Sequence, residues 1–243
     1  MGLLTARPSS TTFVVDDPYF LDIKENPNWQ SQFGNDHPLK LEIGFGMGEF
    51  LISMAKREPD SNFVGIDFSQ DGIKKILENI RSSQLKNILV VFGDVREKLP
   101  HLFRAEELNS VYINLPDPWP KKRHFKRRLI KPELVKLISQ KLAPNGCVHL
   151  ATDSESYAME MLEYFKAESS MQNVNHETGI SYVRKNLPKT KYEKSFLYAG
   201  DKIHYLEYSK VIDCEAHPKK EETRVSEPER PLNNDEYLTR KFQ

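Results

Sequence analysis

The run Leu39-Lys-Leu-Glu-Ile-Gly-Phe-Gly-Met-Gly48, followed by Glu49–Arg57, predicts a strand, a glycine turn and a helix. The strand segment is short and apolar, and apolar residues recur at helical spacing after the turn. Gly44, Gly46 and Gly48 let the backbone approach a ligand, and the start of the helix offers free N–H groups. Such a unit cradles nucleotides. A purely structural turn is the alternative reading of the glycines alone.

Strands and helices are expected to alternate along the following chain. Apolar runs predict strands at 62–66, 88–92, 111–115 and 147–151, and periodic segments predict helices at 71–81, 132–142 and 155–167. This alternation indicates an α/β fold with a doubly wound, mostly parallel sheet. Residues 175–187 are expected to contain a further strand and a loop. A short helix then opens at residues 190–193 and ends at Gly200, before a terminal strand over 202–211.

Length and composition suggest one α/β domain with additions. The chain has 243 residues, 38% of them hydrophobic, which is enough to bury a full core. Residues 1–36 are polar and interrupted by prolines, and predict an irregular arm. The domain itself is expected over 37–211. Residues 212–243 combine mixed charge with three prolines, so a flexible tail is expected there.

Cysteine usage and hydropathy indicate the compartment. Cys147 and Cys214 lie far apart, which argues for a reducing environment without a disulfide framework. No apolar run approaches the roughly 18 residues of a membrane span, and the N-terminus has no signal-peptide pattern. The protein is therefore expected in the cytoplasm, away from membranes. The sequence leaves monomer and homodimer open.

Acidic residues follow four of the predicted strands: Asp67, Asp94, Asp117 and Asp153. Because ligands bind at the carboxyl edge of such sheets, these carboxylates predict one shared pocket. Asp67 comes about 20 residues after the glycines, where an acid accepts hydrogen bonds from ribose hydroxyls. Glu42 and the other carboxylates favour a cationic ligand and would repel a pyrophosphate. An NAD-type oxidoreductase on the same sheet is nevertheless an alternative.

The segment that follows the strand 111–115 combines stiffness with positive charge. Pro116, Pro118 and Pro120 fix φ at alternate positions around Asp117. Six cations then fall within residues 121–128, in a chain with zero formal net charge. Such an asymmetry predicts a polyanion next to Asp117. A solvated basic loop and a catalytically silent RNA-binding module are the alternatives.

Taken together, these motifs resemble the bacterial tRNA (guanine-N7)-methyltransferases, a class I S-adenosylmethionine-dependent family. The resemblance covers about residues 37–211. It is carried by Glu42-Ile-Gly-Phe-Gly-Met-Gly48, Gly65-Ile-Asp67, Gly93-Asp94, Pro116-Asp-Pro-Trp-Pro-Lys-Lys-Arg-His-Phe-Lys-Arg-Arg128, Thr152-Asp153 and Thr190-Lys-Tyr-Glu193. The chain departs from the family where many members have Glu in place of Asp67. Its first 36 residues also lack the Arg-rich character of some members, and its tail is unfamiliar.

The resemblance implies a Rossmann-like fold, S-adenosylmethionine as cofactor without a metal, and tRNA as partner. The implied product is N7-methylguanosine at position 46 of the variable loop. By resemblance, the donor lies among Glu42, Gly44, Gly46, Gly48, Asp67, Asp94 and Asp117, and Asp117 is also the catalytic residue. The implied substrate contacts are Lys121, Asp153, Thr190, Lys191, Tyr192 and Glu193. The implied RNA contacts are Lys122, Arg123, His124, Phe125, Lys126, Arg127, Arg128 and Leu129.

Guanine chemistry gives these residues distinct roles. N7 has a lone pair and no proton, so methyl transfer needs approach geometry and charge stabilisation, which we assign to Asp117. Asp153 or Glu193 is expected to accept hydrogen bonds from guanine N1–H and the 2-amino group. Trp119, Phe125 and Tyr192 are candidates to stack on the exposed base. The plainer alternatives are that Trp119 anchors the core and that Asp153 caps a helix.

Overall fold

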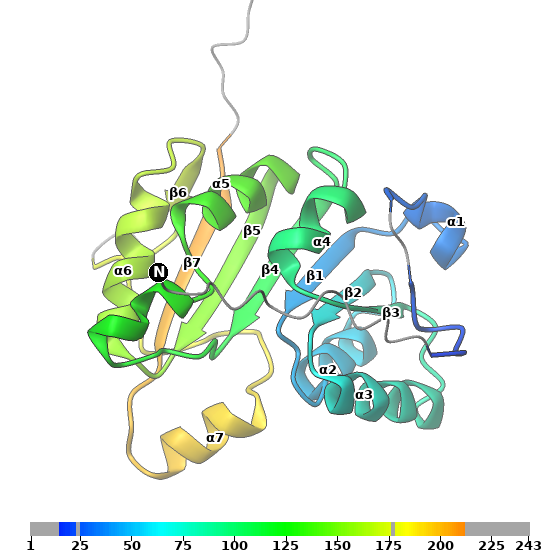
Figure 1. Ribbon diagram of the computed structural model, residues 1–243, viewed down its shortest axis with the longest axis horizontal. Coiled ribbons are helices and arrows are strands. Elements are labelled where there is room, and N and C mark those ends of the chain that lie inside the picture. The colour runs from blue at the N-terminus through cyan, green and yellow to red at the C-terminus, as the bar shows by residue number, and fades with distance from the viewer. Residues whose placement is uncertain (1–14, 23–24, 176–177, 212–243) are drawn as a thin grey trace, which may run out of the picture. The chain divides into compact units, whose positions relative to one another are not determined.

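The computed structural model describes residues 15–22, 25–175 and 178–211. Within them, seven strands form one sheet in the order β3-β2-β1-β4-β5-β7-β6 (Figure 1). The strands are β1 (Leu39–Ile43), β2 (Asn62–Asp67), β3 (Ile88–Phe92), β4 (Leu108–Asn114), β5 (Leu142–Thr152), β6 (Met171–Asn173) and β7 (His204–Lys210). β1 to β5 run parallel to one another, and β7 is antiparallel to both β5 and β6. This confirms the predicted doubly wound, mostly parallel sheet with a terminal strand.

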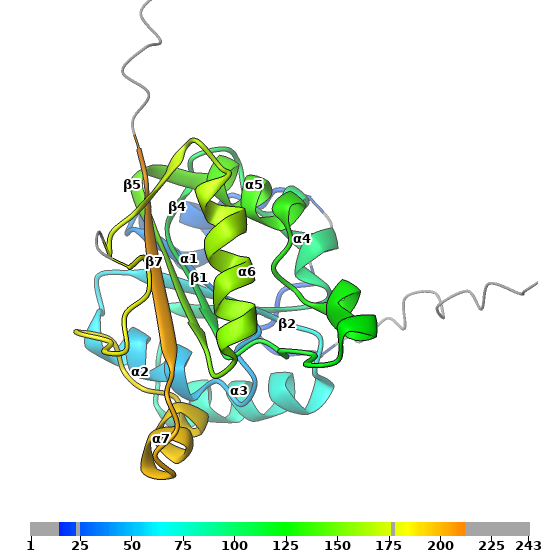
Figure 2. The same ribbon diagram turned by 90° about the vertical axis from the view of Figure 1, so that its left-hand side faces the viewer.

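Helices cover both faces of the sheet. They are α1 (Trp29–Phe33), α2 (Glu49–Arg57), α3 (Gln70–Ser82), α4 (Val95–Leu102), α5 (Pro132–Lys141), α6 (Glu155–Lys166) and α7 (Lys191–Tyr198), with a 3-10 helix η1 (Lys122–Arg127) after β4. α4, α5 and α6 pack on one face, and α2 and α3 pack on the other (Figures 1 and 2). α7 projects from one end of the sheet (Figure 1). None of the helices in the described part is both long and apolar enough to span a membrane.

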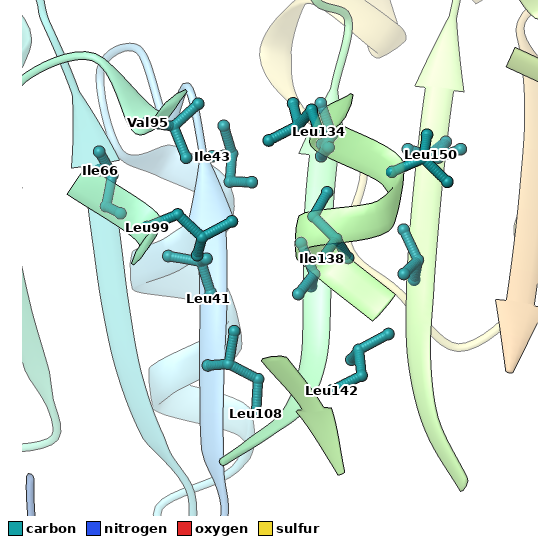
Figure 3. Packing of buried hydrophobic residues seen from close by; sticks show 14 of the residues in the cluster. Leu41, Ile43, Ile66, Val95, Leu99, Leu108, Leu134, Ile138, Leu142 and Leu150 are labelled. Carbon is teal, nitrogen blue, oxygen red and sulfur yellow. The ribbon is translucent and has the colours of Figure 1, made fainter. Parts of the chain in front are cut away.

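The larger core lies between the sheet and α4, α5 and α6. Leu41 and Ile43 on β1 point toward Leu99 of α4, and Leu134 and Ile138 of α5 approach β4 and β5 (Figure 3). This face collects alternate strand residues, as a pleated strand requires. The residues between them, including Glu42, therefore face the side of α2 and α3.

Three elements differ from the sequence prediction. α4 was not predicted, and it contains Pro100 together with charged residues. β5 begins at Leu142, which pairs with Leu108, and a register shift precedes the pairing of Cys147 with Ser110. The predicted strand within 175–187 is wrong for the residues described. The three-residue strand β6 precedes this range. The described part of the range itself contacts the sheet through an isolated bridge from Ser181 to Tyr205.

The described part of the N-terminal arm is anchored by two aromatic residues. Phe20 is buried and forms a bridge to Val90 at the edge of β3. Trp29 starts the short α1, stacks on Phe103 at 5.2 Å and donates its indole N–H to the Leu102 carbonyl at 3.0 Å. The predicted irregular arm therefore includes one helical turn. The predicted tail, 212–243, lies outside the described residues.

Candidate active site

A cavity of about 680 Å³ opens where β1, β4 and β5 end. Its walls come from the glycine turn after β1, the loop after β4, the end of β5 and the start of α7. Eight of the predicted site residues line it: Glu42, Gly44, Gly46, Asp117, Asp153, Thr190, Lys191 and Tyr192. The topology thus brings together residues that are far apart in the sequence, because parallel strands end at one edge.

The glycine turn has a backbone that other residues seldom adopt. Gly44, Gly46 and Gly48 have φ values of 73°, 56° and 80°. A Cβ at Gly44 or Gly46 would meet nothing within 4 Å, whereas one at Gly48 would lie 2.5 Å from Ile76. The first two glycines therefore leave room toward the cavity. The third allows α3 to pack closely.

Asp67 holds this turn in place. Its Oδ2 accepts a hydrogen bond from the Gly46 N–H at 2.8 Å, and its Oδ1 accepts one from the Ser69 N–H at 2.8 Å. The side chain is largely buried and does not line the cavity. Burial raises the pKa of Asp67, and the backbone hydrogen bonds oppose this rise. Each oxygen has spare acceptor capacity, so a ribose contact stays a prediction.

Glu42 is the buried carboxyl group of the cavity wall. Its side chain is 1% exposed, and its Oε1 accepts a hydrogen bond from the Asn114 side-chain amide at 2.9 Å. Its Oε2 has no hydrogen-bond partner among the described residues. Loss of hydration raises the pKa of Glu42 to about 8. A buried acceptor without a donor fits a ligand that brings a cation or an N–H group.

Asp117 lies on a loop with unusual backbone geometry, residues 115–120. Leu115 and Trp119 have φ values of 49° and 44°, in the left-handed region that non-glycine residues rarely occupy. Asp117 itself is exposed and lines the cavity. The carboxylate therefore faces the same space as the glycine turn.

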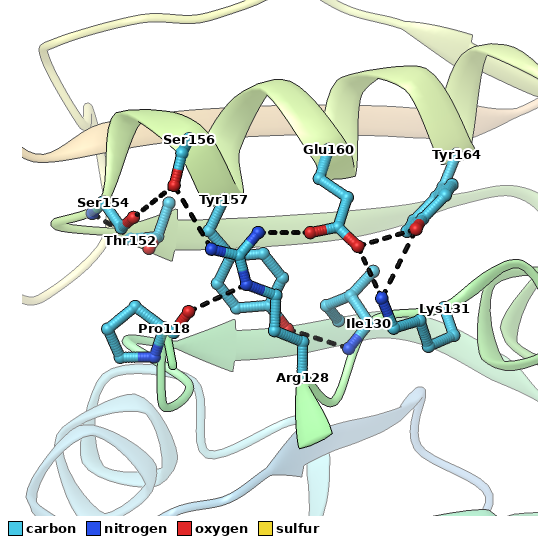
Figure 4. A network of polar contacts seen from close by, with 10 residues as sticks. All are labelled: Pro118, Arg128, Ile130, Lys131, Thr152, Ser154, Ser156, Tyr157, Glu160 and Tyr164. Carbon is cyan, nitrogen blue, oxygen red and sulfur yellow. Dashed lines mark hydrogen bonds and ion pairs between the residues drawn. The ribbon is translucent and has the colours of Figure 1, made fainter. Parts of the chain in front are cut away.

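Arg128 fastens this loop to α6, as Figure 4 shows. Its Nε donates to the Pro118 carbonyl at 2.8 Å, and its guanidinium forms an ion pair with Glu160 and a hydrogen bond with Ser156. The side chain is 1% exposed. The position of Arg128 therefore does not support the predicted contact with RNA. All of these partners are internal, and its role is to hold the carbonyl next to Asp117.

The rest of the basic segment is accessible. Lys121, Lys122, Arg123, Lys126 and Arg127 are exposed, mostly on η1. The Arg127 guanidinium lies 4.9 Å from the centre of the Trp119 ring, and His124 meets the edge of the same ring at 5.7 Å. Trp119, His124 and Phe125 are half-buried. Leu129 packs against the core, so it is less suited to RNA contact than these cations.

The start of α7 is fixed by a capping box. Thr190 accepts a hydrogen bond from the Glu193 N–H at 3.0 Å, and the Glu193 carboxylate accepts one from the Thr190 N–H at 2.7 Å. Glu193 is fully buried, accepts a further bond from the Tyr205 hydroxyl at 3.0 Å and does not line the cavity. The prediction that Glu193 touches the substrate is therefore not supported by its position. Asp153, by contrast, lines the cavity.

Other predicted residues lie off the cavity wall. Asp94 caps α4 by accepting from the Arg96 N–H at 2.9 Å and forms an ion pair with the Arg96 side chain. Gly48 and Lys121 also do not line the cavity. Sequence reasoning missed Asn114 and Phe196, which do. Asn114 carried a usable signal, since it is a polar residue at the carboxyl end of a strand.

A second cluster of possible ligands lies on β5 and β7. One ligand atom each from Cys147, His149 and Glu207 falls within 4.8 Å of the others, a spacing that could hold a metal ion. His149 stacks on Tyr112 at 5.1 Å, and burial lowers its pKa to about 4, with Arg184 and Lys40 adding to the effect. Those two cations also disfavour a metal ion. None of the three clustered residues lines the cavity.

Known proteins are similar to this chain in sequence. A family model described as "Putative methyltransferase" matches residues 36–206. The tRNA (guanine-N(7)-)-methyltransferase of Vibrio parahaemolyticus is 36% identical over 185 residues, which cover 76% of this chain and 77% of the relative. The chain belongs to this methyltransferase family. Proteins of the same name from Alkalilimnicola ehrlichii and Idiomarina loihiensis are 39% and 41% identical, over 73% and 67% of this chain and 75% and 66% of the relatives.

Solved structures support the fold of this methyltransferase family member. The 16S rRNA methyltransferase KamB aligns with a TM-score of 0.57 and 14% identity, over 78% of this chain and 96% of that one. A structure described as an antibiotic-related methyltransferase aligns with a TM-score of 0.56 and 15% identity, over 82% and 100% of the two chains. These similarities show the fold alone, which is the class I methyltransferase architecture. Membership of the methyltransferase family makes S-adenosylmethionine the methyl donor.

Proposed function

We propose that this protein transfers a methyl group from S-adenosylmethionine to N7 of a guanosine in tRNA. One observation carries the proposal: Asp117, on the proline-stiffened loop, shares a cavity with the glycine turn and the start of α7. Relatives that bear the name tRNA (guanine-N(7)-)-methyltransferase align over about three quarters of the chain. We further propose that the target lies in the variable loop, at position 46.

The cavity residues fit the methyl donor. S-adenosylmethionine supplies an electrophilic methyl group on a positively charged sulfonium. Glu42 offers a buried oxygen without a hydrogen-bond partner among the described residues, and Gly44 and Gly46 leave open space beside it. Acidic groups around a cation lower its energy, and the same groups would repel a pyrophosphate. This charge pattern supports the methyl donor over a dinucleotide.

The catalytic work at guanine is positioning and charge stabilisation. Guanine N7 carries no proton, so the site needs no general base to activate it. Positive charge develops on the purine ring as N7 is alkylated, and the fixed Asp117 carboxylate stabilises that charge. Asp153, on the cavity wall, accepts hydrogen bonds from N1–H and the 2-amino group, which selects guanine over adenine.

RNA is held by exposed cations beside the cavity. Lys122, Arg123, Lys126 and Arg127 flank the Asp117 loop, and Lys191 and Tyr192 stand at the start of α7. Phosphates bind the cations, and Tyr192, which is 68% exposed, offers a ring for stacking on the displaced base.

The test is to incubate unmodified bulk tRNA with the protein and S-adenosylmethionine, digest the RNA and map modified nucleosides by mass spectrometry. We expect N7-methylguanosine in a single fragment that contains the variable loop. Methylation of another base, or none, would overturn the activity. N7-methylguanosine elsewhere in tRNA would overturn only the assigned position.

Replacing Asp117 tests the catalytic assignment. We expect Asp117→Asn to lower kcat by roughly 100-fold or more, because the variant keeps the shape of the side chain and loses its charge. Donor and tRNA affinities should change little. Asp60→Asn is the matched control, since Asp60 is an exposed acid in the turn before β2. Full activity of Asp117→Asn would remove Asp117 from this role.

A further inference from the structure

Arg184 is a buried arginine in the segment between β6 and α7. Its side chain is 4% exposed. One guanidinium nitrogen, Nη2, donates to Asn114 Oδ1 at 2.7 Å, and the other, Nη1, donates to Glu193 Oε2 at 3.3 Å. The guanidinium also lies 5.0 Å from the centre of the Tyr205 ring. A buried cation is tolerated only where such partners satisfy it, and the partners of Arg184 lie on both β4 and α7.

The contact with Asn114 determines which way the amide faces. Asn114 Oδ1 accepts from Arg184, and its Nδ2 consequently donates to Glu42 Oε1 at 2.9 Å. A flipped amide would place an NH₂ group against the guanidinium and a carbonyl against the carboxyl group. Arg184 thus orients the single donor that Glu42 has among the described residues. The other oxygen of Glu42 has no partner among them, and Glu42 lines the cavity.

The contact with Glu193 reaches the opposite wall. Glu193 caps α7 through Thr190, and Thr190, Lys191 and Tyr192 line the cavity across from the glycine turn. We propose that Arg184 is a positioning residue that fixes both walls of the methyl-transfer site at once. It holds Asn114 and Glu42 on the donor side and the base of α7 on the guanine side. This inference rests on the proposed function, since its ligand is the methyl donor.

The proposal has an electrostatic consequence for Glu42. Its pKa of about 8 is raised mainly by burial, and among nearby charges Arg184 lowers it while Asp67 and Glu193 raise it. The other charged residues that line the same cavity are Glu49, Asp117, Asp153 and Lys191. Loss of the Arg184 charge should therefore raise the pKa of Glu42 further. Loss of the Glu193 charge should lower it.

The experiment measures S-adenosylmethionine affinity by calorimetry between about pH 6 and pH 9. The cationic donor prefers ionised Glu42, so affinity should rise with pH through the pKa of that group. In Arg184→Gln we expect the midpoint of the curve of donor affinity against pH to move up by about one pH unit. Donor binding should then be roughly tenfold weaker near neutral pH and much less affected in alkali. In Glu193→Gln the midpoint should move down. Ionisation of S-adenosylmethionine itself does not affect the difference between variants, because all of them are measured with the same ligand at the same pH values.

Arg57→Gln is the matched control. Arg57 also anchors the segment before α7, by donating to the Asn186 carbonyl at 3.1 Å, but within the described part of the chain it has no hydrogen bond to Asn114 or Glu193. Its midpoint should equal that of the wild type. An equal loss of affinity at every pH in Arg184→Gln, or the same midpoint shift in Arg57→Gln, would overturn the proposal.

Arg184→Lys covers the case in which Arg184→Gln does not fold. Lysine keeps the charge but is a compact ammonium without the planar fork that reaches both acceptors. We expect the midpoint of donor affinity against pH to equal that of the wild type. The kcat for tRNA should fall at least about tenfold, because α7 loses its anchor. Full activity of Arg184→Lys would contradict the two-walled role. Absence of donor binding by the wild type would instead overturn the proposed function.

Discussion

Glu42 illustrates the cost of a buried functional group. In the unfolded chain its carboxyl group ionises near its ordinary pKa of 4.5, but burial raises this pKa to about 8 in the folded protein, which therefore keeps the proton longer as pH rises. Between these values the unfolded state releases a proton that the folded state retains. Wild-type stability should therefore fall as pH rises through this window.

Replacing Glu42 by Gln should remove that loss. We expect Glu42→Gln to leave the free energy of unfolding nearly unchanged near pH 4.5 and to raise it relative to wild type by roughly 2–4 kcal/mol above pH 8. Urea unfolding at the two pH values measures this. Glu163→Gln, at an exposed position on α6, is the control. A Glu42→Gln effect that is the same at both pH values would show that ionisation is not the cause.

Two residues of the same charge have different roles at the end of η1. Arg128 is buried against Glu160 and the Pro118 carbonyl, whereas Lys126, on η1, is exposed. We expect Arg128→Ala to lower the free energy of unfolding by about 3 kcal/mol, because Glu160 loses a buried partner and, among the described residues, keeps Lys131 alone as an ion pair. It should also lower kcat, because the Asp117 loop loses its anchor.

Lys126→Ala should show the opposite pattern. Stability should change by less than about 0.5 kcal/mol, and the slope of log affinity for tRNA against log salt should become shallower by about 1. Arg128→Ala should leave that slope unchanged, since Arg128 neutralises no phosphate. Filter binding at several salt concentrations measures both slopes. A shallower slope in Arg128→Ala would return Arg128 to the RNA surface.

The elements with strong local signals could be predicted from the sequence. β1, α2 and β3 have the bounds that their apolar patterns indicated, and the start of α7 followed from Thr190 and Glu193, which form a capping box. α4 could not be found in this way, because Pro100 and its charged residues suppress the local helix signal. It is stabilised instead by burial of Val95, Leu99 and Leu102 against the sheet.

Side-chain environment was harder to predict than position along the chain. The sequence placed Asp117, Glu42 and the glycine turn correctly at one edge, because alternating strands and helices make the strands parallel and their carboxyl ends then share that edge. It could not distinguish Arg128 from the exposed cations beside it, because the partner Glu160 lies on another element. Arg184 escaped notice for the same reason, since its partner Asn114 is 70 residues away.

At the scale of the whole molecule, charge is separated on a chain with zero net charge. The 35 basic and 35 acidic residues balance, yet exposed cations crowd residues 121–127 while carboxyl groups gather on the cavity wall. The acidic cavity suits a cationic donor, and the exposed cations of residues 121–127, which we call the basic rim, suit the phosphates around the target base. Affinity for tRNA should therefore depend on where positive charge lies and not on its total.

A matched pair of triple variants tests this. The first variant replaces Lys122, Lys126 and Arg127 together by Ala. It should bind tRNA more weakly, and the slope of log affinity against log salt concentration should become shallower by about 2 to 3. The control variant replaces Lys74, Lys136 and Lys166 by Ala, which removes the same charge from exposed positions on α3, α5 and α6. Because these lysines lie away from the loop after β4, their replacement should change the slope by less than about 0.5. Equal slopes in the two variants would show that net charge, and not the basic rim, attracts the RNA.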